Sequence, residues 1–287
     1  MAYRQDEDLS FLAQADNADL DVLVKYITTT KNGRTRLTEE LTRHPRYIAN
    51  QPDHVKYWDL IAAEIQSFGA NTFATLLRGG EGVLYKEVLT DVCKKLKVNF
   101  NKNSSVELIE RNLLLKLLED SLEKLTDEDL RNLVESLKLK TTSFSKQAIM
   151  AAIQFAIRQG GFASYKIALI VANAVAKTLI GRGLSLAANA SLTKAISIFA
   201  GPIGWAVTAI WTAFDIAGPA YRVTIPCVIQ IAYMRTKMLA NLPEDEDQDV
   251  ENVHVIIQCP SCTKKNRVQV DKLKQSKCGQ CGSRLAE

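Results

Sequence analysis

The stretch from Ile167 to Met234 is the feature that most constrains how this chain can fold, because it is almost free of charge. Five of its 68 residues are charged, about 7%, against 24% for the whole chain. Two Gly-Pro pairs, Gly201-Pro202 and Gly218-Pro219, interrupt it. Since proline lacks a backbone N–H and kinks or ends a helix, the stretch predicts several short apolar helices rather than one long one.

The two longest apolar pieces of this stretch predict a helical hairpin. The first, Ala195–Phe214, is an uncharged run of 20 residues, the length that a membrane span of about 30 Å requires. A helix that starts at Pro202, however, keeps 13 of those residues, which is too few to span. The second piece, Val223–Met234, has 12 residues, with Pro226 in its first turn, where proline is tolerated.

Certain side chains of this hairpin are candidates for contact with a membrane or a partner. They are Trp205, Trp211, Phe214, Asp215 and Arg222. Aromatic rings suit a membrane interface as well as a protein core. The two opposite charges stand at the bend between the pieces, where they could pair or mark a polar interface. Three covers for the hairpin remain open: the protein's own helices, lipid after a conformational change, or the helix of a partner.

Residues 1–158 show the periodicity of amphipathic helices in a soluble protein. Apolar residues recur at i, i+3, i+4 and i+7 from Leu20 to Ile27, and Asp16 or Asn17 can cap that helix. Thr126 has Asp129 three positions later, which resembles a capping box. Further helices are predicted over 53–69, 82–98 and 105–125.

We therefore expect a mainly α fold in four parts. The predicted parts are an amphipathic helical bundle at 1–158, the apolar hairpin region at 159–240, an acidic linker at 241–253 and a small zinc ribbon with short β-strands at 254–287. The N-terminus lacks the basic and apolar regions of a secretory signal. With that and the pattern of cysteines, we expect a reducing cytoplasm, with attachment to or insertion in the inner membrane as an alternative.

The ribbon rests on two CxxC pairs, Cys259 with Cys262 and Cys278 with Cys281, separated by fifteen residues. Zinc prefers four soft ligands in a tetrahedron, and each pair supplies two thiolates from one turn. The sequence predicts one structural Zn²⁺ there, with no open position for catalysis. A pair of redox dithiols is the alternative, but the βαβ context of such motifs is lacking.

The charge of the ribbon argues against nucleic acid as its main partner. From Asn252 onward, seven Lys or Arg and two Asp or Glu give +5, and four thiolates with one zinc ion reduce this to about +3. No aromatic residue is present there to stack on bases. A protein partner is the stronger expectation, and nucleic-acid binding through the ribbon ranks third among the possible functions. The ribbon also resembles the N-terminal zinc ribbon of zinc-containing thioredoxins, which implies a ribbon and no activity.

Motifs for catalysis are lacking in the sequence. It contains neither a Walker A loop, nor a G-x-S-x-G elbow, nor an H-E-x-x-H helix. His44 and His54 lie in a polar stretch and are expected at the surface. We therefore expect a protein that is not an enzyme.

Three segments resemble the YaaW-like family of bacterial proteins. They are "YRQDEDLSFLAQADNADLDVLVKYITTTKNGRTRLTEEL", "LLRGGEGVLYKEVLTDVCKKLKV" and "AYRVTIPCVIQIAYMR". That family is linked by distant similarity to ubiquinol–cytochrome c chaperones, which are helical assembly factors. The resemblance implies a protein-binding, assembly or chaperone-like factor. A membrane-active effector that inserts the hairpin, in the manner of pore-forming toxins, is the alternative.

Overall fold

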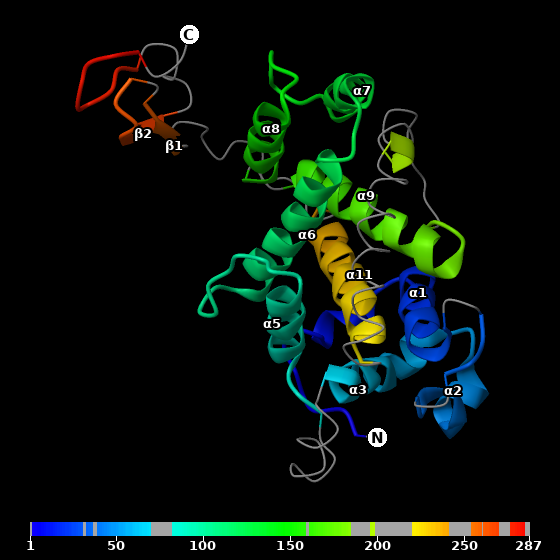
Figure 1. The fold of residues 1–287 in the computed structure, drawn as a ribbon. Coiled ribbons are helices and arrows are strands. Elements are labelled where there is room, and N and C mark those ends of the chain that lie inside the picture. Colours follow the sequence, from blue (N-terminus) through cyan, green and yellow to red (C-terminus); the bar gives the residue numbers. More distant parts are fainter. Residues whose placement is uncertain are drawn as a thin grey trace. The chain divides into compact units, whose positions relative to one another are not determined.

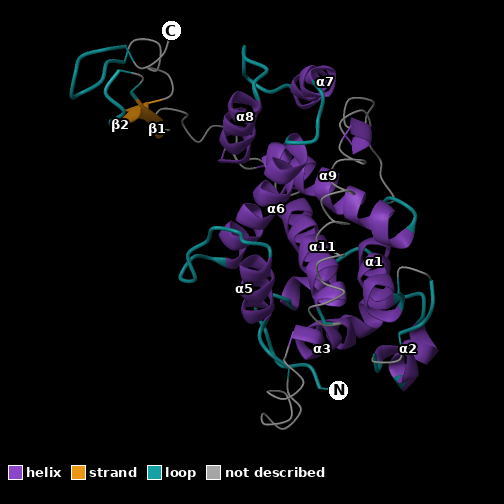
Figure 2. Cartoon of the chain, in the orientation of Figure 1, coloured by secondary structure: helices purple, strands orange, loops and turns teal. Residues whose placement is uncertain are grey.

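The computed structural model of the chain describes residues 2–30, 33–36, 39–69, 82–158, 161–184, 196–198, 220–240, 254–259, 261–269 and 276–284. The chain divides into two compact units, Met1–Leu242 and Pro243–Glu287. Helices build the described part of the first unit, and a pair of strands lies in the second (Figure 2). The mainly α fold with a small C-terminal β module is therefore confirmed, and the division at residues 158, 240 and 253 stays a prediction.

The helices of the first unit follow one another along the chain with short 3-10 helices (η) between some of them. They are η1 (Ser10–Gln14), α1 (Asn17–Thr28), η2 (Leu41–Arg43), α2 (Pro45–Asn50), η3 (His54–Tyr57), α3 (Trp58–Gly69), α5 (Tyr85–Lys95), α6 (Val106–Leu122), α7 (Asp127–Leu137), α8 (Lys146–Arg158), α9 (Gly161–Ile180) and α11 (Tyr221–Ala240). The helices predicted over 53–69, 82–98 and 105–125 are confirmed as η3 with α3, as α5 and as α6.

Helix α11 lies at the centre of this unit. It packs along α9 and also contacts α1, α3, α5 and α6, which surround it in Figure 1. All twelve residues from Val223 to Met234 are buried. A helix that is apolar on every face is stable in water only when every face is covered. In this chain, α9 and the amphipathic helices of the same unit provide that cover.

The position of α11 corrects the predicted second arm of the hairpin. A short helix over Val223–Met234 was expected, with Pro226 in its first turn, whereas the helix runs from Tyr221 to Ala240 with Pro226 inside it. Proline cannot donate the helical bond to the carbonyl four residues earlier, but most helical stability in proteins comes from packing, and this helix is packed on all sides. Of the three covers left open for this run, the protein's own helices are the one that α11 has.

The rest of the predicted hairpin lies mainly outside the described residues. Residues 196–198 are helical, but Trp205, Trp211, Phe214 and Asp215 belong to segments that the structure does not describe, so the hairpin is not shown. Arg222 is described; it lies in the first turn of α11 and is partly buried. Among the helices within the described ranges, none combines the length and the hydropathy that crossing a membrane requires.

Local helix signals were predicted well. At the start of α7, the Asp129 N–H donates to the Thr126 hydroxyl and the Thr126 N–H donates to the Asp129 carboxylate, each at 3.2 Å, which confirms the capping box. At the start of α6, the Leu108 N–H donates to Ser105 Oγ. Asp16 occupies the N-cap of α1, but its side chain makes no capping bond.

The N-terminal segment is tied into the bundle by a buried carboxylate. Asp6 is 5% exposed, and its Oδ2 accepts the N–H of Tyr85, the first residue of α5, at 2.6 Å. The Gln66 side chain of α3 donates to the same oxygen at 3.3 Å and exchanges two hydrogen bonds with the backbone of Arg4. A negative charge at a helix N-terminus is stabilising, so Asp6 fixes the approach of α3 and α5.

The second unit is organised by one antiparallel pair of strands. β1 (His254–Gln258) pairs with β2 (Lys265–Gln269) so that His254 lies opposite Gln269 and Gln258 opposite Lys265. Six residues connect the ends of the two strands, and they include the first CxxC pair. The strands therefore deliver that cysteine pair at the tip of a hairpin.

Candidate metal centre

The first cysteine pair forms a tight turn directly after β1. The Cys259 N–H donates to the Lys264 carbonyl at 2.8 Å, and the Thr263 N–H donates to the Cys259 carbonyl at 2.9 Å. Thr263 has a φ of 58° in this turn. This is the left-handed region, which a β-branched residue seldom adopts. The turn thus places strain on Thr263 in order to hold the two cysteines on one side.

The second pair repeats the same turn at the same spacing. The Cys278 N–H donates to the Ser283 carbonyl at 2.8 Å, and the Gly282 N–H donates to the Cys278 carbonyl at 2.9 Å. Gly282 occupies the position that Thr263 has in the first turn, with a φ of 74°, which costs glycine little. Two turns with one hydrogen-bond pattern present their cysteine pairs in the same way.

The four cysteine sulfurs lie together. The Sγ atoms of Cys259, Cys262, Cys278 and Cys281 are all within 4.8 Å of one another. Two of the distances between the turns, from Cys259 to Cys281 and from Cys262 to Cys278, are 3.5 Å. Zinc with four thiolates at about 2.3 Å places the sulfurs about 3.8 Å apart. The set therefore fits a tetrahedral ion in its donor chemistry and its size. Four cysteines in this arrangement could hold a metal ion.

Donors around the sulfurs support this centre. The Gln280 N–H and the Asn266 side-chain amide lie 3.4 and 3.5 Å from Cys278 Sγ, and Asn266 Oδ1 accepts the Gly279 N–H at 3.0 Å. Such outer contacts orient metal ligands and adjust their charge. Asn266 lies on β2, so it joins the strands to the second turn. Sequence reasoning did not single it out; its place in the strand between the two CxxC pairs was the available signal.

The same donors affect the ionisation of the thiols. The Gln280 N–H, followed by the N–H of Cys281, lowers the pKa of Cys278 to about 6. The Ser283 hydroxyl lowers the pKa of Cys281. At Cys262 a nearby backbone N–H lowers the pKa, but contacts with the other thiols together with burial outweigh it and raise the pKa to about 12. Cys278 thus favours the thiolate, the form that binds metal, and the pKa of Cys281 is shifted in the same direction.

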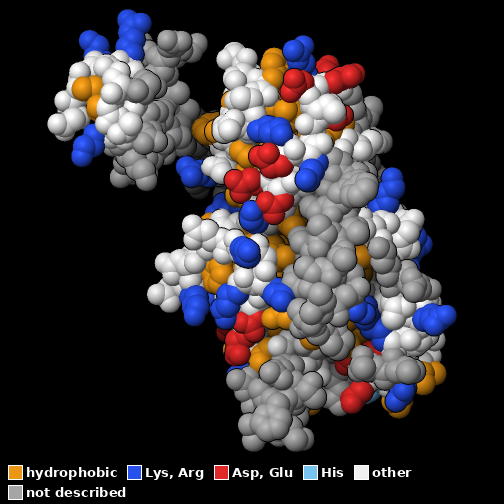
Figure 3. Space-filling view, in the orientation of Figure 1, with side chains coloured by type: hydrophobic (Ala, Val, Ile, Leu, Met, Phe, Trp, Pro, Cys, Tyr) orange, Lys and Arg blue, Asp and Glu red, His pale blue; other side chains and the backbone are white. Residues whose placement is uncertain are grey.

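The described surface of this unit is basic. The charged side chains that the structure describes there are Lys264, Lys277 and Arg284, all of them exposed, and Figure 3 shows Lys and Arg without Asp or Glu on the described part of this face. Four thiolates around a divalent cation carry a charge of −2. The basic side chains therefore balance part of the charge of a filled centre.

The helical unit holds a buried ion pair that sequence reasoning missed. Glu110 of α6 is 3% exposed; its Oε1 accepts the Tyr85 hydroxyl at 2.6 Å and its Oε2 accepts Arg235 Nε at 2.9 Å. The Arg235 guanidinium also donates to the Asp8 carbonyl and lies 4.5 Å from the ring centre of Phe11. The sequence feature that could have indicated this ion pair is a glutamate, Glu110, on the apolar face of α6. Breaking such a pair is costly, so it marks a rigid point between α5, α6 and α11.

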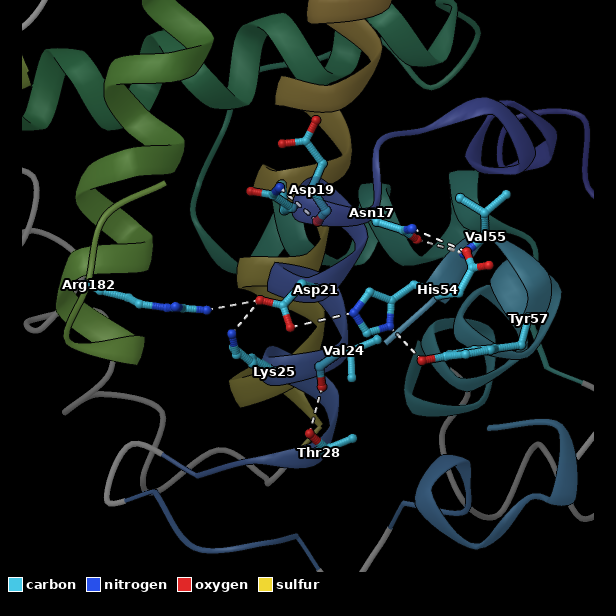
Figure 4. Close-up of polar contacts among 12 residues, drawn as sticks. Asn17, Asp19, Asp21, Val24, Lys25, Thr28, His54, Val55, Tyr57 and Arg182 are labelled. Carbon is cyan, nitrogen blue, oxygen red and sulfur yellow. Dashed lines mark hydrogen bonds and ion pairs between the residues drawn. The ribbon is translucent and has the colours of Figure 1, made fainter. Parts of the chain in front are cut away.

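A second polar network joins α1 to η3 and to the turn after α9 (Figure 4). Asp21 lies 3.5 Å from His54 Nε2 and 2.9 Å from Arg182, and His54 Nδ1 lies 2.5 Å from the Tyr57 hydroxyl. His54 is 5% exposed, so its expected place at the surface is wrong. The polar residues around it in the sequence concealed a histidine that packs inward. Burial raises the pKa of Tyr57 to about 12, which makes this tyrosine a poor nucleophile.

Two family models match the helical part of the chain. Residues 53–229 match a family described as Ubiquinol-cytochrome C chaperone, and residues 3–37 match a domain of unknown function (DUF3944). Together they extend from the N-terminal segment into α11. The cysteine module lies beyond both matches. It is thus a separate addition to the matched region.

Several bacterial proteins are similar to the chain over most of its length. A UPF0174 protein of Helicobacter pylori strain J99 is 48% identical over 254 residues, covering 88% of this chain and 100% of the relative. A second UPF0174 protein of that strain is 41% identical over 209 residues, covering 71% and 100%. The UPF0174 protein YaaW of Escherichia coli K12 is 30% identical over 243 residues, covering 83% and 97%. No solved structure matches the chain.

Proposed function

Because the chain belongs to the UPF0174 family, we propose that it is a non-enzymatic protein-binding factor with an assembly or chaperone-like role. The observation that carries this proposal is the match of residues 53–229 to a family described as a chaperone. The helical unit agrees with it, since two ionisable groups in its described interior are engaged in structural contacts. Glu110 and His54 are the examples, each held between neighbouring side chains.

The second part of the proposal is that the cysteine module holds one structural zinc ion. The four thiols within 4.8 Å and their two matching turns support it. All four donors are sulfur, which favours zinc over magnesium or calcium. A centre with four protein ligands has no open position for a substrate, so the ion would stabilise a binding surface rather than perform chemistry. Thiolate ligands also suit a reducing compartment, which favours the cytoplasm.

Membrane insertion is the less favoured alternative to this proposal. The second arm of the predicted hairpin is the centre of the helical unit, and its twelve core residues would have to leave their cover in order to enter lipid. Within the described ranges, no observation favours a pore-forming role.

Co-purification at native abundance tests the main proposal. The tagged chain is cross-linked in its own bacterium, purified, and compared with a version in which all four module cysteines are serine. We expect one protein at a near-equal molar ratio, and the purified pair should re-form a complex that light scattering after size exclusion resolves. If the chain is recovered alone or only with copies of itself, the proposal fails. Loss of the partner from the serine version assigns the contact to the module; retention assigns it to the helical unit.

A further inference from the structure

The helical unit contains a cavity that none of the roles above uses. It has a volume of about 210 Å³ and lies where the first half of α6 meets the end of α8, the start of α9 and the last two turns of α11. Its apolar walls come from Leu108, Leu114, Ile157, Ile167 and Leu239. Leu239 is 51% exposed, and large apolar side chains with that exposure are few among the described residues. A ligand in the cavity would cover it.

Most of the charge in the cavity wall is already balanced. Glu110 and Arg235 line the cavity, but they bind each other and are held further by Tyr85 and by the Asp8 carbonyl. This pair therefore contributes no net charge to a ligand. It forms a fixed polar floor.

Glu107 is also balanced, by the start of its own helix. Burial acts to raise its pKa, but its own backbone N–H, the Ser105 hydroxyl and Arg235 outweigh burial and lower it. Glu107 lies in the first turn of α6, where the helix dipole favours a negative charge. Its carboxylate is thus held by the helix end.

Arg111 differs from Glu107, Glu110 and Arg235 in its contacts. It lines the cavity from α6 and is half-buried, and among the described residues no acceptor forms an ion pair or hydrogen bond with it. A guanidinium prefers a bidentate carboxylate or phosphate partner. The cavity therefore combines apolar walls with one cation to be satisfied, which is the chemistry of a site for an amphiphilic anion.

We propose that this cavity binds a carboxylate on an aliphatic stem, with the carboxylate at Arg111 and the stem against Leu114, Ile157 and Leu239. Its size fits this class: a cavity of about 150 Å³ can hold benzene, whereas sites for drug-sized molecules begin at roughly 300 Å³. A free fatty acid of medium length and the apolar C-terminal residue of a polypeptide share this chemistry. The proposal is independent of the partner-binding role.

Ligand titrations on the full chain test the site. Octanoate represents the free acid, acetyl-Ala-Ala-Leu with a free carboxylate represents a chain end, and octanamide is the uncharged control. Binding is followed by methyl NMR of Ile157, Ile167 and Leu239. We expect saturation at one ligand per chain by at least one of the two acids, and the acid that binds identifies the source.

Variants then separate the charge from the apolar walls. Arg111→Gln should weaken binding about tenfold, the lower range for a charged hydrogen bond that is partly exposed. Arg43→Gln, at an exposed arginine of η2, should leave binding unchanged. Ala240→Phe, which fills the cavity from α11, should abolish it. Circular dichroism checks that each variant is folded. Octanamide binding as tightly as octanoate, wild-type affinity in Arg111→Gln, or no saturation by either acid would overturn the proposal.

Discussion

The helical unit and the cysteine module differ in what the described residues bury. Helix α11 gives the first unit a continuous apolar core, with Val228 and Ile231 fully buried between the helices that surround it. In the module, the buried side chains among the described residues are Cys259 and Cys278, both of them candidate metal ligands. Apolar packing therefore holds the first unit together, and for the module we propose that a metal ion bound by its four sulfurs does so. Small domains that lack a core often depend on a metal in this way.

The largest expected effect is the loss of the metal. Cys278→Ser removes one of four thiolates, and since structural zinc contributes on the order of 10 kcal/mol to folding, the module should lose its strands while the helical unit stays folded. Atomic spectroscopy should show about one zinc lost per chain, and NMR should show loss of the dispersed amide signals of β1 and β2. Ser261→Ala, an exposed change in the same turn, should retain the metal. An unchanged zinc content in Cys278→Ser would refute the proposal that a metal ion holds the module together.

The converse change should affect the helical unit alone. Ile231→Ala leaves a cavity at a fully buried position of α11 and should lower the free energy of unfolding of that unit by about 3 kcal/mol. Chemical denaturation followed by helical circular dichroism measures this, and the zinc content should not change. Met238→Ala, at a side chain that is 40% exposed, is the control and should cost much less. Equal losses in both variants would mean that α11 is not the core.

A smaller effect should depend on pH. Burial, together with Glu39 and Glu40, raises the pKa of Glu64 from 4.5 to about 7, although the Glu40 N–H opposes this by donating to Glu64 Oε1 at 2.7 Å. The folded state thus holds this proton more tightly than the unfolded state does, so stability from this group is complete below about pH 4.5 and is lost as the pH rises to about 7. Glu64→Gln keeps a side-chain oxygen that can accept the Glu40 N–H, and it removes the group that titrates.

The Glu64→Gln variant should therefore equal the wild type near pH 4.5 and exceed it by about 2 kcal/mol at pH 8. Denaturation at both pH values measures the difference. Glu119→Gln, at an exposed position of α6, should show no such dependence. A Glu64→Gln effect that is the same at both pH values would contradict the assignment. At each pH, the zinc content of the module should be the same in Glu64→Gln as in the wild type.

The smallest effect compares the two turns of the module. Thr263 and Gly282 occupy the same left-handed position, so Thr263→Gly should relieve strain and Gly282→Ala should introduce it, each by about 1 kcal/mol. Competition with a zinc chelator should show tighter zinc binding in Thr263→Gly and weaker binding in Gly282→Ala, by several-fold each. Changes in the same direction would show that the two turns are not equivalent.

Many helices of the first unit and the cysteine cluster of the second could be predicted from local sequence patterns. The periodicity of residues 105–125 predicts α6, the spacing of Thr126 and Asp129 predicts a cap, and two CxxC pairs predict one cluster, because each signal involves residues close in sequence. The place of α11 could not be predicted. A helix that is apolar on every side suits a core, lipid or a partner equally, and the choice depends on faces that other helices supply.

Distant polar contacts were hidden for the same reason. Asp6 stands in an acidic N-terminal segment that resembles an exposed one, yet it accepts the N–H of Tyr85, 79 residues away. His54 stands among polar neighbours and packs inward through Tyr57 and Asp21. Local composition reports which residues can face water. It does not report which of them form hydrogen bonds with a helix that is distant in the sequence.

The central position of α11 has a consequence for synthesis. The ribosome makes α1, α3, α5, α6 and α9 before the helix on which all of them pack. At roughly 5–20 residues per second, on the order of ten to fifty seconds pass before Ala240 is added. During that time the growing chain exposes apolar faces that have no partner within it. A protein proposed to bind other polypeptides therefore has itself, while it is being translated, the surface of a client for the cell's chaperones.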